Sequence, residues 1–140
     1  MTTLDFIRNN HLKVGDKLVR EKGILSKHHG IYVGIHNGQP LVAENQVGHG
    51  VHYITLSNFL KHDYRNITRI EKFPRSDYHR QQVVSHINSY VGTPYDVLTF
   101  NCEHFANLIQ YGRAESKQAI TALAATLIGL IIVGTYMSSQ

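Results

Sequence analysis

The feature that most constrains the fold is the segment from Ala119 to Met137, which contains no charged residue. Leucine, isoleucine and valine lie in near succession within it. As a helix the segment would extend for about 28 Å, close to the thickness of the hydrocarbon core of a bilayer. A helix that is apolar on all sides must be surrounded by apolar material, and a small domain has little room to do so. We therefore predict a transmembrane anchor over residues 119–137 and a folded domain over residues 1–113.

Charge and cysteine content predict that the domain lies on the cytosolic side. Arg113 and Lys117 precede the apolar segment, and positively charged flanks tend to remain in the cytosol. A chain of 140 residues has the size of a single domain. Its one cysteine cannot form an internal disulfide, and the polar stretch at residues 8–11 does not follow a secretory signal. We expect a reducing compartment and the cytosolic face of a membrane, with a single-pass C-terminal anchor.

The cysteine, Cys102, lies where a helix is expected to begin. Glycine and proline at residues 92–94 interrupt the preceding pattern, and apolar residues then recur at helical spacing over residues 102–111. Asn101 is a favoured N-cap residue, and Gly112 is a favoured left-handed terminator. In a first turn, unpaired N–H groups and the helix dipole would lower the pKa of a thiol and could receive an oxyanion. Cys102 is thus a candidate nucleophile; the alternative is a small buried cysteine that only packs.

Two adjacent histidines, His28 and His29, precede a short apolar stretch bounded by glycines. Residues 31–33 are strand formers, so the histidines would lie at the start of a buried strand. Successive side chains of a strand point to opposite faces, and only one of the two can therefore face Cys102. A cysteine and a histidine that are distant in sequence are the usual partners in an acyl-transfer site. The alternative is that either histidine is an ordinary polar residue at a strand end.

Together, the segments His-His-Gly-Ile-Tyr-Val-Gly at residues 28–34 and Asn-Cys-Glu-His-Phe at residues 101–105 resemble the lecithin:retinol acyltransferase family. The resemblance covers most of the chain and is closest to the small phospholipase A and acyltransferase members, the HRAS-like suppressors. It implies that Cys102 is the nucleophile, that His28 is the general base and that His29 has no catalytic part. It also implies a circularly permuted papain-like fold, similar to cell-wall peptidases, with an antiparallel sheet packed on the nucleophile helix.

The third member of the site departs from the family pattern. The family usually places a second histidine, or another polar residue, on the following strand to orient the base. Here the turn at residues 35–40 looks longer, and the next strand, residues 41–43, leads to Glu44. A carboxylate could accept the imidazole N–H and stabilise the imidazolium, so we predict Glu44 as the orienting residue. If Glu44 points away, His49 or His52 could replace it, or the site would work as a Cys-His dyad.

The remaining pattern predicts an α+β fold in which strands are followed by helices. Strands are expected at residues 17–20, 31–33, 41–43, 50–54 and 66–71, and helices at 55–62, 77–91 and 102–111. The helix at residues 77–91 has an apolar stripe, with Ser76 as its cap.

The net charge and the histidine content indicate which partners and cofactors to expect. A net charge of +4 could attract nucleic acid or anionic lipid, and together with the anchor it favours lipid. We expect no nucleic-acid partner, because the basic residues form no such motif and are interpreted as a solvated surface. They are Lys13, Lys17, Arg20, Lys22 and Lys27. The ten histidines are scattered without the spacing of a zinc site, so we expect neither metal nor cofactor.

The resemblance implies a thiol-dependent phospholipase A1/A2 and acyltransferase that acts on glycerophospholipids through an acyl-thioester on Cys102. The acceptor could be water, an amine or a lysolipid hydroxyl. A second hypothesis is a non-enzymatic interaction module, because some picornaviral 2A-type proteins of this group keep the motif without an established activity. A third, a cell-wall peptidase, follows from fold analogy alone and suits a cytosolic anchored protein poorly.

Overall fold

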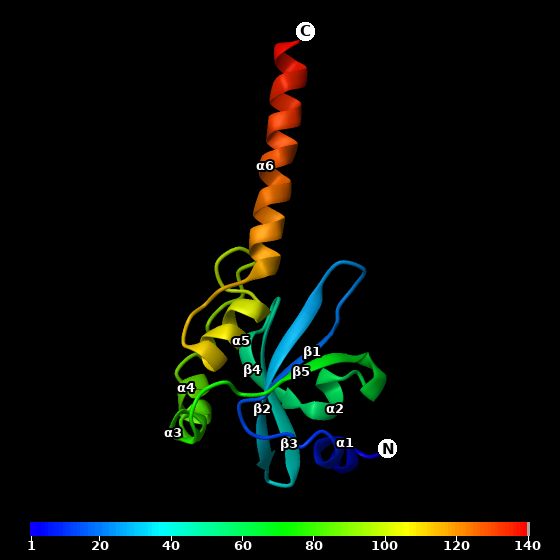
Figure 1. Cartoon of the computed structure of the whole chain (residues 1–140), viewed down its shortest axis with the longest axis vertical. Helices are drawn as coiled ribbons and strands as arrows, with labels where there is room; N and C mark the ends of the chain where they lie inside the picture. Colours follow the sequence, from blue (N-terminus) through cyan, green and yellow to red (C-terminus); the bar gives the residue numbers. More distant parts are fainter. Residues whose placement is uncertain (140) are drawn as a thin grey trace.

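The computed structural model describes residues 1–139 and shows a small domain from which one long helix projects (Figure 1). The strands are β1 (Lys17–Glu21), β2 (Lys27–His36), β3 (Gln39–Gln46), β4 (Gly50–Thr55) and β5 (Ile67–Glu71). The helices are α1 (Thr3–Asn9), α2 (Leu56–Phe59), α3 (Asp77–Gln81), α4 (Val83–Asn88), α5 (Cys102–Tyr111) and α6 (Lys117–Ser138), with a 3-10 turn at Tyr64–Asn66. The predicted α+β class is confirmed.

The five strands form one antiparallel sheet in the order β4-β3-β2-β1-β5. The central strand, β2, pairs Gly30 with Glu44 of β3 and His28 with Arg20 of β1. Directly opposed residues of antiparallel strands have their side chains on the same face. His28, Glu44 and Arg20 therefore share one face of the sheet, and His29 points to the other, as the alternation of a strand requires.

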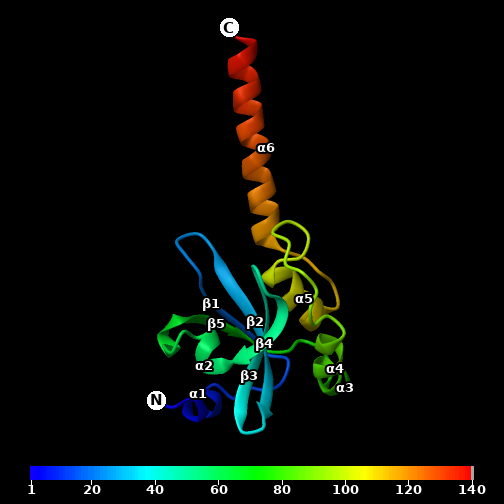
Figure 2. The same cartoon turned by 180° about the vertical axis from the view of Figure 1, so that it is seen from behind.

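Each face of the sheet has its own apolar core. On the face of His29, side chains of β2 pack against α5; the members include Ile31, Val33, Phe105, Ala106 and Ile109. On the face of His28, side chains of the sheet pack against α1 and α2; the members include Phe6, Tyr32, Val42, Leu56 and Phe59. Figures 1 and 2 show α5 on one side of the sheet, with α1 and α2 on the other.

The connection between β2 and β3 is shorter than predicted. The strands extend to His36 and from Gln39, and only Asn37 and Gly38 join them. Both residues have positive φ, 50° and 77°, as a two-residue type I′ hairpin turn requires. The prediction of a long turn at residues 35–40 is therefore wrong. The pairing of β2 with β3 shifts its register between Tyr32 and Gly34. With this shift, Glu44 pairs with Gly30, near the start of β2.

The helix predicted at residues 77–91 is two short helices. Ser76 caps α3 as predicted, because its side chain accepts a hydrogen bond from the N–H of His79. The backbone breaks at Gln82, where α3 ends and α4 begins. Arg80 of α3 donates to the carbonyl of Val14. Val83 and Ile87 of α4 instead pack in the core with side chains of α5. The two short helices thus make different contacts.

Two of the basic residues interpreted as solvated are buried. Nζ of Lys17 lies 2.7 Å from Oε2 of Glu71 and donates to Asn107. The guanidinium of Arg20 lies over the ring of Phe59, with its carbon 5.3 Å from the ring centroid. The prediction fails for these two because helices cover both faces of the sheet at β1: Lys17 lies against α5, and Arg20 lies against α2.

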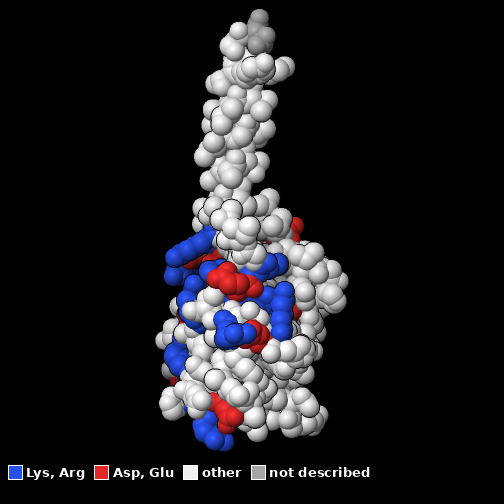
Figure 3. Space-filling model, turned by 90° about the vertical axis from the view of Figure 1, so that its right-hand side faces the viewer, with Lys and Arg blue, Asp and Glu red and all other residues white. Residues whose placement is uncertain are grey.

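Helix α6 projects from the domain as a single rod (Figures 1 and 2). Of the helices within residues 1–139, it is the one long and apolar enough to cross a membrane. Beyond its first turn its side chains are exposed, including Ile128 and Ile131. Figure 3 shows charged side chains over the domain and none along the rod. Helix α6 is therefore not a core helix of the domain.

Candidate active site

The helix of the candidate nucleophile, α5, begins and ends where the sequence predicts. Asn101 is its N-cap, and the side-chain oxygen of Asn101 accepts from the N–H groups of Glu103 (2.9 Å) and His104 (3.0 Å). Gly112 ends the helix with a left-handed φ of 76°. Because the cap occupies two of the first-turn amides, the amide of Cys102 is the one that remains to receive an oxyanion.

Cys102 lies against the backbone of β2 at Lys27 and His29. Its side chain is 3% exposed, and Sγ lies 3.7 Å from the carbonyl oxygen of Lys27. Burial raises the pKa of the thiol above its ordinary value of 9.0, although the N–H of His29 and the charge of Lys22 act in the opposite direction. The prediction of a lowered pKa is wrong for this state, because loss of hydration outweighs the nearby donors. A thiol held in this way needs a base to remove its proton.

Three polar side chains, from β2, β3 and β4, form a row from the interior of the domain toward its surface. Nε2 of His28 lies 3.2 Å from Oε1 of Glu44, and both side chains are 1% exposed. The other carboxylate oxygen of Glu44 lies 3.5 Å from Nε2 of His52, which is partly exposed. His49 stacks on His52, with the ring centroids 5.3 Å apart. In the structure, Glu44 thus lies between His28 and His52. The catalytic roles of Cys102, His28 and Glu44 stay predictions.

The surroundings of His28 keep its ring neutral near pH 7. Burial lowers the pKa of His28 below 6.5, and the hydrogen bond and charge of Glu44 oppose this shift. The ring of Phe59 stacks on the imidazole at 5.5 Å between centroids. Within residues 1–139, Nδ1 of His28 is buried without a hydrogen-bond partner. A carboxylate only accepts, so a neutral His28 carries its proton on Nε2 and offers Nδ1 as the basic atom.

His29 has a different set of neighbours. Its Nε2 lies 3.5 Å from Nε2 of Gln118, at the start of α6. Burial lowers the pKa of His29 to about 4, although the charge of Glu103 opposes this shift. The thiol of Cys102 contacts the backbone of this strand at the carbonyl of Lys27 and the N–H of His29, and α5 packs on the face of the sheet to which the His29 side chain points. In the part of the chain that the structure describes, His28 is the one whose ring is hydrogen-bonded to a carboxylate.

Arg20 is a member of the site that sequence reasoning missed. Its side chain is almost buried, and burial lowers the pKa of the guanidinium, while the charges of Glu44 and Cys102 raise it. Arg20 opposes His28 in the pairing of β1 with β2. Strand pairing is the signal that could have revealed it, and that pairing is not visible in the sequence.

Asn45 and Tyr95 are two further members that were missed. The side chain of Asn45, next to Glu44 in β3, donates to the carbonyl of Phe100 at 2.7 Å and so ties the sheet to the start of α5. Burial raises the pKa of Tyr95, and the charge of Cys102 acts in the same direction. A polar residue directly after Glu44 was a local signal for Asn45.

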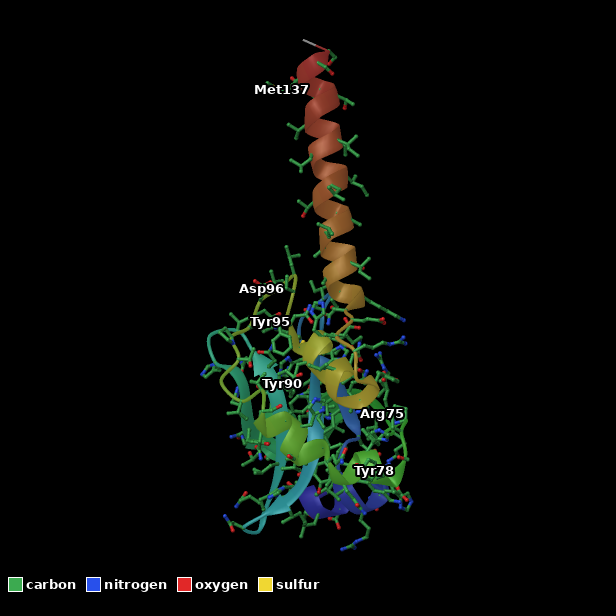
Figure 4. All side chains as sticks on the ribbon, turned by 90° about the vertical axis from the view of Figure 1, so that its left-hand side faces the viewer. Arg75, Tyr78, Tyr90, Tyr95, Asp96 and Met137 are labelled. Carbon is green, nitrogen blue, oxygen red and sulfur yellow. The ribbon has the colours of Figure 1, made fainter. Side chains whose placement is uncertain are left out.

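A cavity of about 860 Å³ opens at Cys102, a size typical of small-molecule sites. Most of its lining comes from three segments, the tip of the β1–β2 hairpin, the loop before α5 and the first turns of α6, and Val47 of the β3–β4 turn adds to it. Tyr95 and Asp96, both part of its wall, lie close to the first turn of α6 (Figure 4). The candidate nucleophile is therefore reached from the end of the domain that carries the apolar helix.

Comparison with protein families gives one match, described as lecithin retinol acyltransferase, over residues 10–115. The chain belongs to the lecithin retinol acyltransferase family. The match includes His28, Glu44 and Cys102 and ends just before α6. No curated protein matches the chain.

Members of the lecithin retinol acyltransferase family are typically thiol acyltransferases, and the domain fits a papain-like fold. Membership supports acyltransferase or phospholipase activity in general and implies lipid substrates. The family predicted from the two motifs is thereby confirmed. The closer resemblance to the HRAS-like suppressors stays a prediction.

Proposed function

We propose that the protein is a thiol-dependent phospholipase A1/A2 and acyltransferase that acts on glycerophospholipids. The observation that carries this proposal is the position of Cys102 at the start of α5, in a cavity next to α6, with Sγ against the carbonyl of Lys27, the residue before His28 of the buried His28–Glu44 pair. A nucleophile, a base and a group that orients the base are the parts that acyl transfer needs. Cys102, His28 and Glu44 fill these roles in that order. The order of His28 before Cys102 fits a circularly permuted papain-like chain.

The first step forms a thioester. Nδ1 of His28 takes the proton of the Cys102 thiol as Sγ attacks the carbonyl carbon of a phospholipid ester. Because burial raises the pKa of the thiol, we expect proton transfer and attack to occur together rather than from a resting thiolate. The N–H of Cys102 donates to the tetrahedral oxyanion, and Glu44 stabilises the imidazolium through Nε2.

The second half of the reaction regenerates the thiol. The His28 imidazolium gives its proton to the leaving oxygen, so the lysophospholipid departs and the acyl group stays on Cys102. Neutral His28 then removes a proton from the incoming acceptor as it attacks the thioester, and the imidazolium returns that proton to Sγ as the C–S bond breaks. Water as acceptor releases a fatty acid, whereas an amine or a lysolipid hydroxyl carries the acyl group away.

The proposal includes a single-pass anchor over residues 119–137, with the catalytic domain, residues 1–113, on the cytosolic face. Helix α6 has the length and composition for this, and the family match ends at residue 115. Arg113 and Lys117 lie at the domain end of the helix, as the positive-inside tendency requires. The anchor would hold the site at the lipid surface and raise the effective substrate concentration.

A non-enzymatic interaction module, as in picornaviral 2A-type proteins, is the second candidate. One observation favours it: Cys102 is buried and its pKa is raised, as expected of a cysteine that only packs.

The deciding experiment compares the full chain with Cys102→Ala on phosphatidylcholine in mixed micelles. Intact mass reports an acyl adduct, and product analysis reports fatty acid. An adduct and fatty acid that both vanish in Cys102→Ala support the enzyme. A folded protein that gives neither supports the interaction module.

A further inference from the structure

The first three turns of α6 form part of the wall of the cavity that holds Cys102. Gln118, Thr121, Ala122 and Ala125 line the same space as the thiol. Their spacing of three and four residues places them on one side of the helix. From Gln118 to Ala125 this side of the helix extends for about 10 Å. The helix therefore contributes to the site itself as well as to membrane attachment.

Hydrogen bonds join the start of α6 to residues next to the proposed nucleophile and the proposed base. Glu103, next to Cys102, accepts from the Ser116 hydroxyl at 2.9 Å and from the N–H of Gln118 at 3.0 Å. Ser116 is the N-cap of α6. The side chain of Gln118 in turn accepts from the N–H of Lys27, next to His28, at 3.1 Å. The start of α6 is thus bonded to a neighbour of the nucleophile and to a neighbour of the base.

The other two walls carry exposed apolar side chains. Leu25 at the hairpin tip is 96% exposed, and Val97 in the loop before α5 is 59% exposed. Both segments lie at the end of the domain from which α6 departs (Figures 1 and 2). Apolar side chains around a cavity mouth, next to a membrane-spanning helix, are suited to contact hydrocarbon rather than water. Lys22 and Lys117 line the same cavity and could hold a phosphate at headgroup level, whereas the ammonium of Lys27 is paired with Glu21.

We propose that this cavity opens laterally into the bilayer and holds the acyl chain of a membrane phospholipid, with α6 as one wall. The side chains of Ala122 and Ala125 leave the room that the chain occupies, so these two positions set the acyl-chain length that reaches Cys102. The proposal deepens the phospholipase proposal and rests on it. It identifies the substrate as a lipid that enters from the hydrocarbon layer along the anchor.

The test uses the single cysteine as a reporter that does not depend on catalysis. The full chain in phosphatidylcholine vesicles is labelled with N-ethylmaleimide and with N-dodecylmaleimide, and the ratio of the two rates is measured. The variants are Ala122→Phe and Ala125→Phe, with Ala124→Phe as the matched control, because Ala124 does not line the cavity. Fatty-acid release from lipids with short and long chains is measured in parallel.

We expect Ala122→Phe and Ala125→Phe to lower the ratio of long-chain to short-chain labelling about tenfold, because an added ring overfills an apolar site. Ala124→Phe should leave the ratio unchanged. An unchanged rate of labelling by N-ethylmaleimide shows that the site around Cys102 is intact. If Ala122→Phe slows labelling by N-ethylmaleimide, the labelling ratio of Ala125→Phe, one turn further along α6, tests the proposal in its place. Equal ratios in all three variants would overturn the wall proposal.

Failure of the enzyme proposal gives a different result. If the wild type releases no fatty acid and forms no acyl adduct, the phospholipase assignment fails whatever the labelling ratio. If fatty acid is released but neither Ala122→Phe nor Ala125→Phe changes the chain-length profile or the ratio, the enzyme stands and the wall proposal fails.

Discussion

Nε2 of His28 lies 3.2 Å from Oε1 of Glu44, and both side chains are buried in the middle of the sheet. The two residues come from neighbouring strands, β2 and β3, whose register places Glu44 opposite Gly30. The carboxylate therefore selects the imidazole tautomer with the proton on Nε2. That choice leaves Nδ1 unprotonated and able to act as a base.

Glu44→Gln should lower acyl-enzyme formation by about 10²–10⁴-fold, as expected when the wrong imidazole tautomer is stabilised. Glutamine keeps the volume of the side chain but can donate to Nε2, which favours the proton on Nδ1. The rate of Cys102 acylation by an activated ester, followed by intact mass, measures the effect. A variant as fast as wild type would remove Glu44 from the proposed site.

His28→Ala should abolish acylation, whereas His29→Gln should retain it within a few-fold. A general base contributes about 10²–10⁴-fold, and of these two histidines His28 is the one whose ring is hydrogen-bonded to Glu44, which prepares it for that role. His29 is held instead between Gln118 and the charge of Glu103. The same acylation assay separates the two histidines. The reverse result would make His29 the base.

The pH profile should show a base that remains active in mild acid. Burial lowers the pKa of His28 below 6.5, so its neutral form persists as the pH falls, and the acid limb of kcat/KM should lie below pH 6.5. Glu44 opposes that shift, so Glu44→Gln should move the limb lower still. In His28→Ala, alkylation of Cys102 should have a midpoint above pH 9, because burial raises the pKa of the thiol. An acid limb above pH 7 in the wild type would contradict this.

Gly30→Ala should damage both stability and activity. A Cβ at this position would lie 2.6 Å from Cε2 of Phe59 and 2.6 Å from Cγ1 of Val42, both of which are fully buried. Overfilling a core typically costs about 1–3 kcal/mol, and here it would push Phe59 from its stack on His28. Thermal unfolding and fatty-acid release measure the two effects. Gly129→Ala is the control, because its Cβ meets open space in α6; equal behaviour of both variants would refute the steric argument.

Glu103→Ala should loosen the start of α6. The buried Ser116 hydroxyl and the N–H of Gln118 would lose their acceptor, at a cost of about 1–3 kcal/mol for each group left without a partner. We expect a lower unfolding temperature in micelles and faster proteolysis before Lys117. Glu115→Ala is the matched control, because Glu115 is exposed and pairs with an exposed Arg113. Equal effects of the two substitutions would mean that Glu103 does not hold the helix.

The elements that the sequence predicts well are those with local signals. Asn101 and Gly112 mark the two ends of α5, and the uncharged run of α6 needs no tertiary information. Helix α1 was missed, although Thr2 and Asp5 form a capping box at its start, because it is short and buries one residue, Phe6. The Asn-Gly turn after β2 was also a local signal, and it was misinterpreted as part of a longer turn.

The candidate site could be predicted only in part. Motif resemblance points to Cys102 and His28, and alternation along a strand separates His28 from His29. Which face α5 covers, and which polar groups lie beside the thiol, depend on strand order. The burial of Arg20 follows from the packing of α2 on its face of the sheet, and the raised pKa of Cys102 follows from the packing around it. These are tertiary effects that no local pattern contains.

The hydrogen bond from the N–H of Lys27 to the side chain of Gln118 joins the first residue of the histidine strand to the first turn of α6. The tilt of a transmembrane helix responds to the hydrophobic thickness of the bilayer around it. In the proposed anchored arrangement, α6 cannot tilt about its first turn without straining this bond or moving the backbone next to His28. Bilayer thickness would then alter the geometry of the proposed base, and we expect the activity of the same sequence to differ between membranes of different thickness.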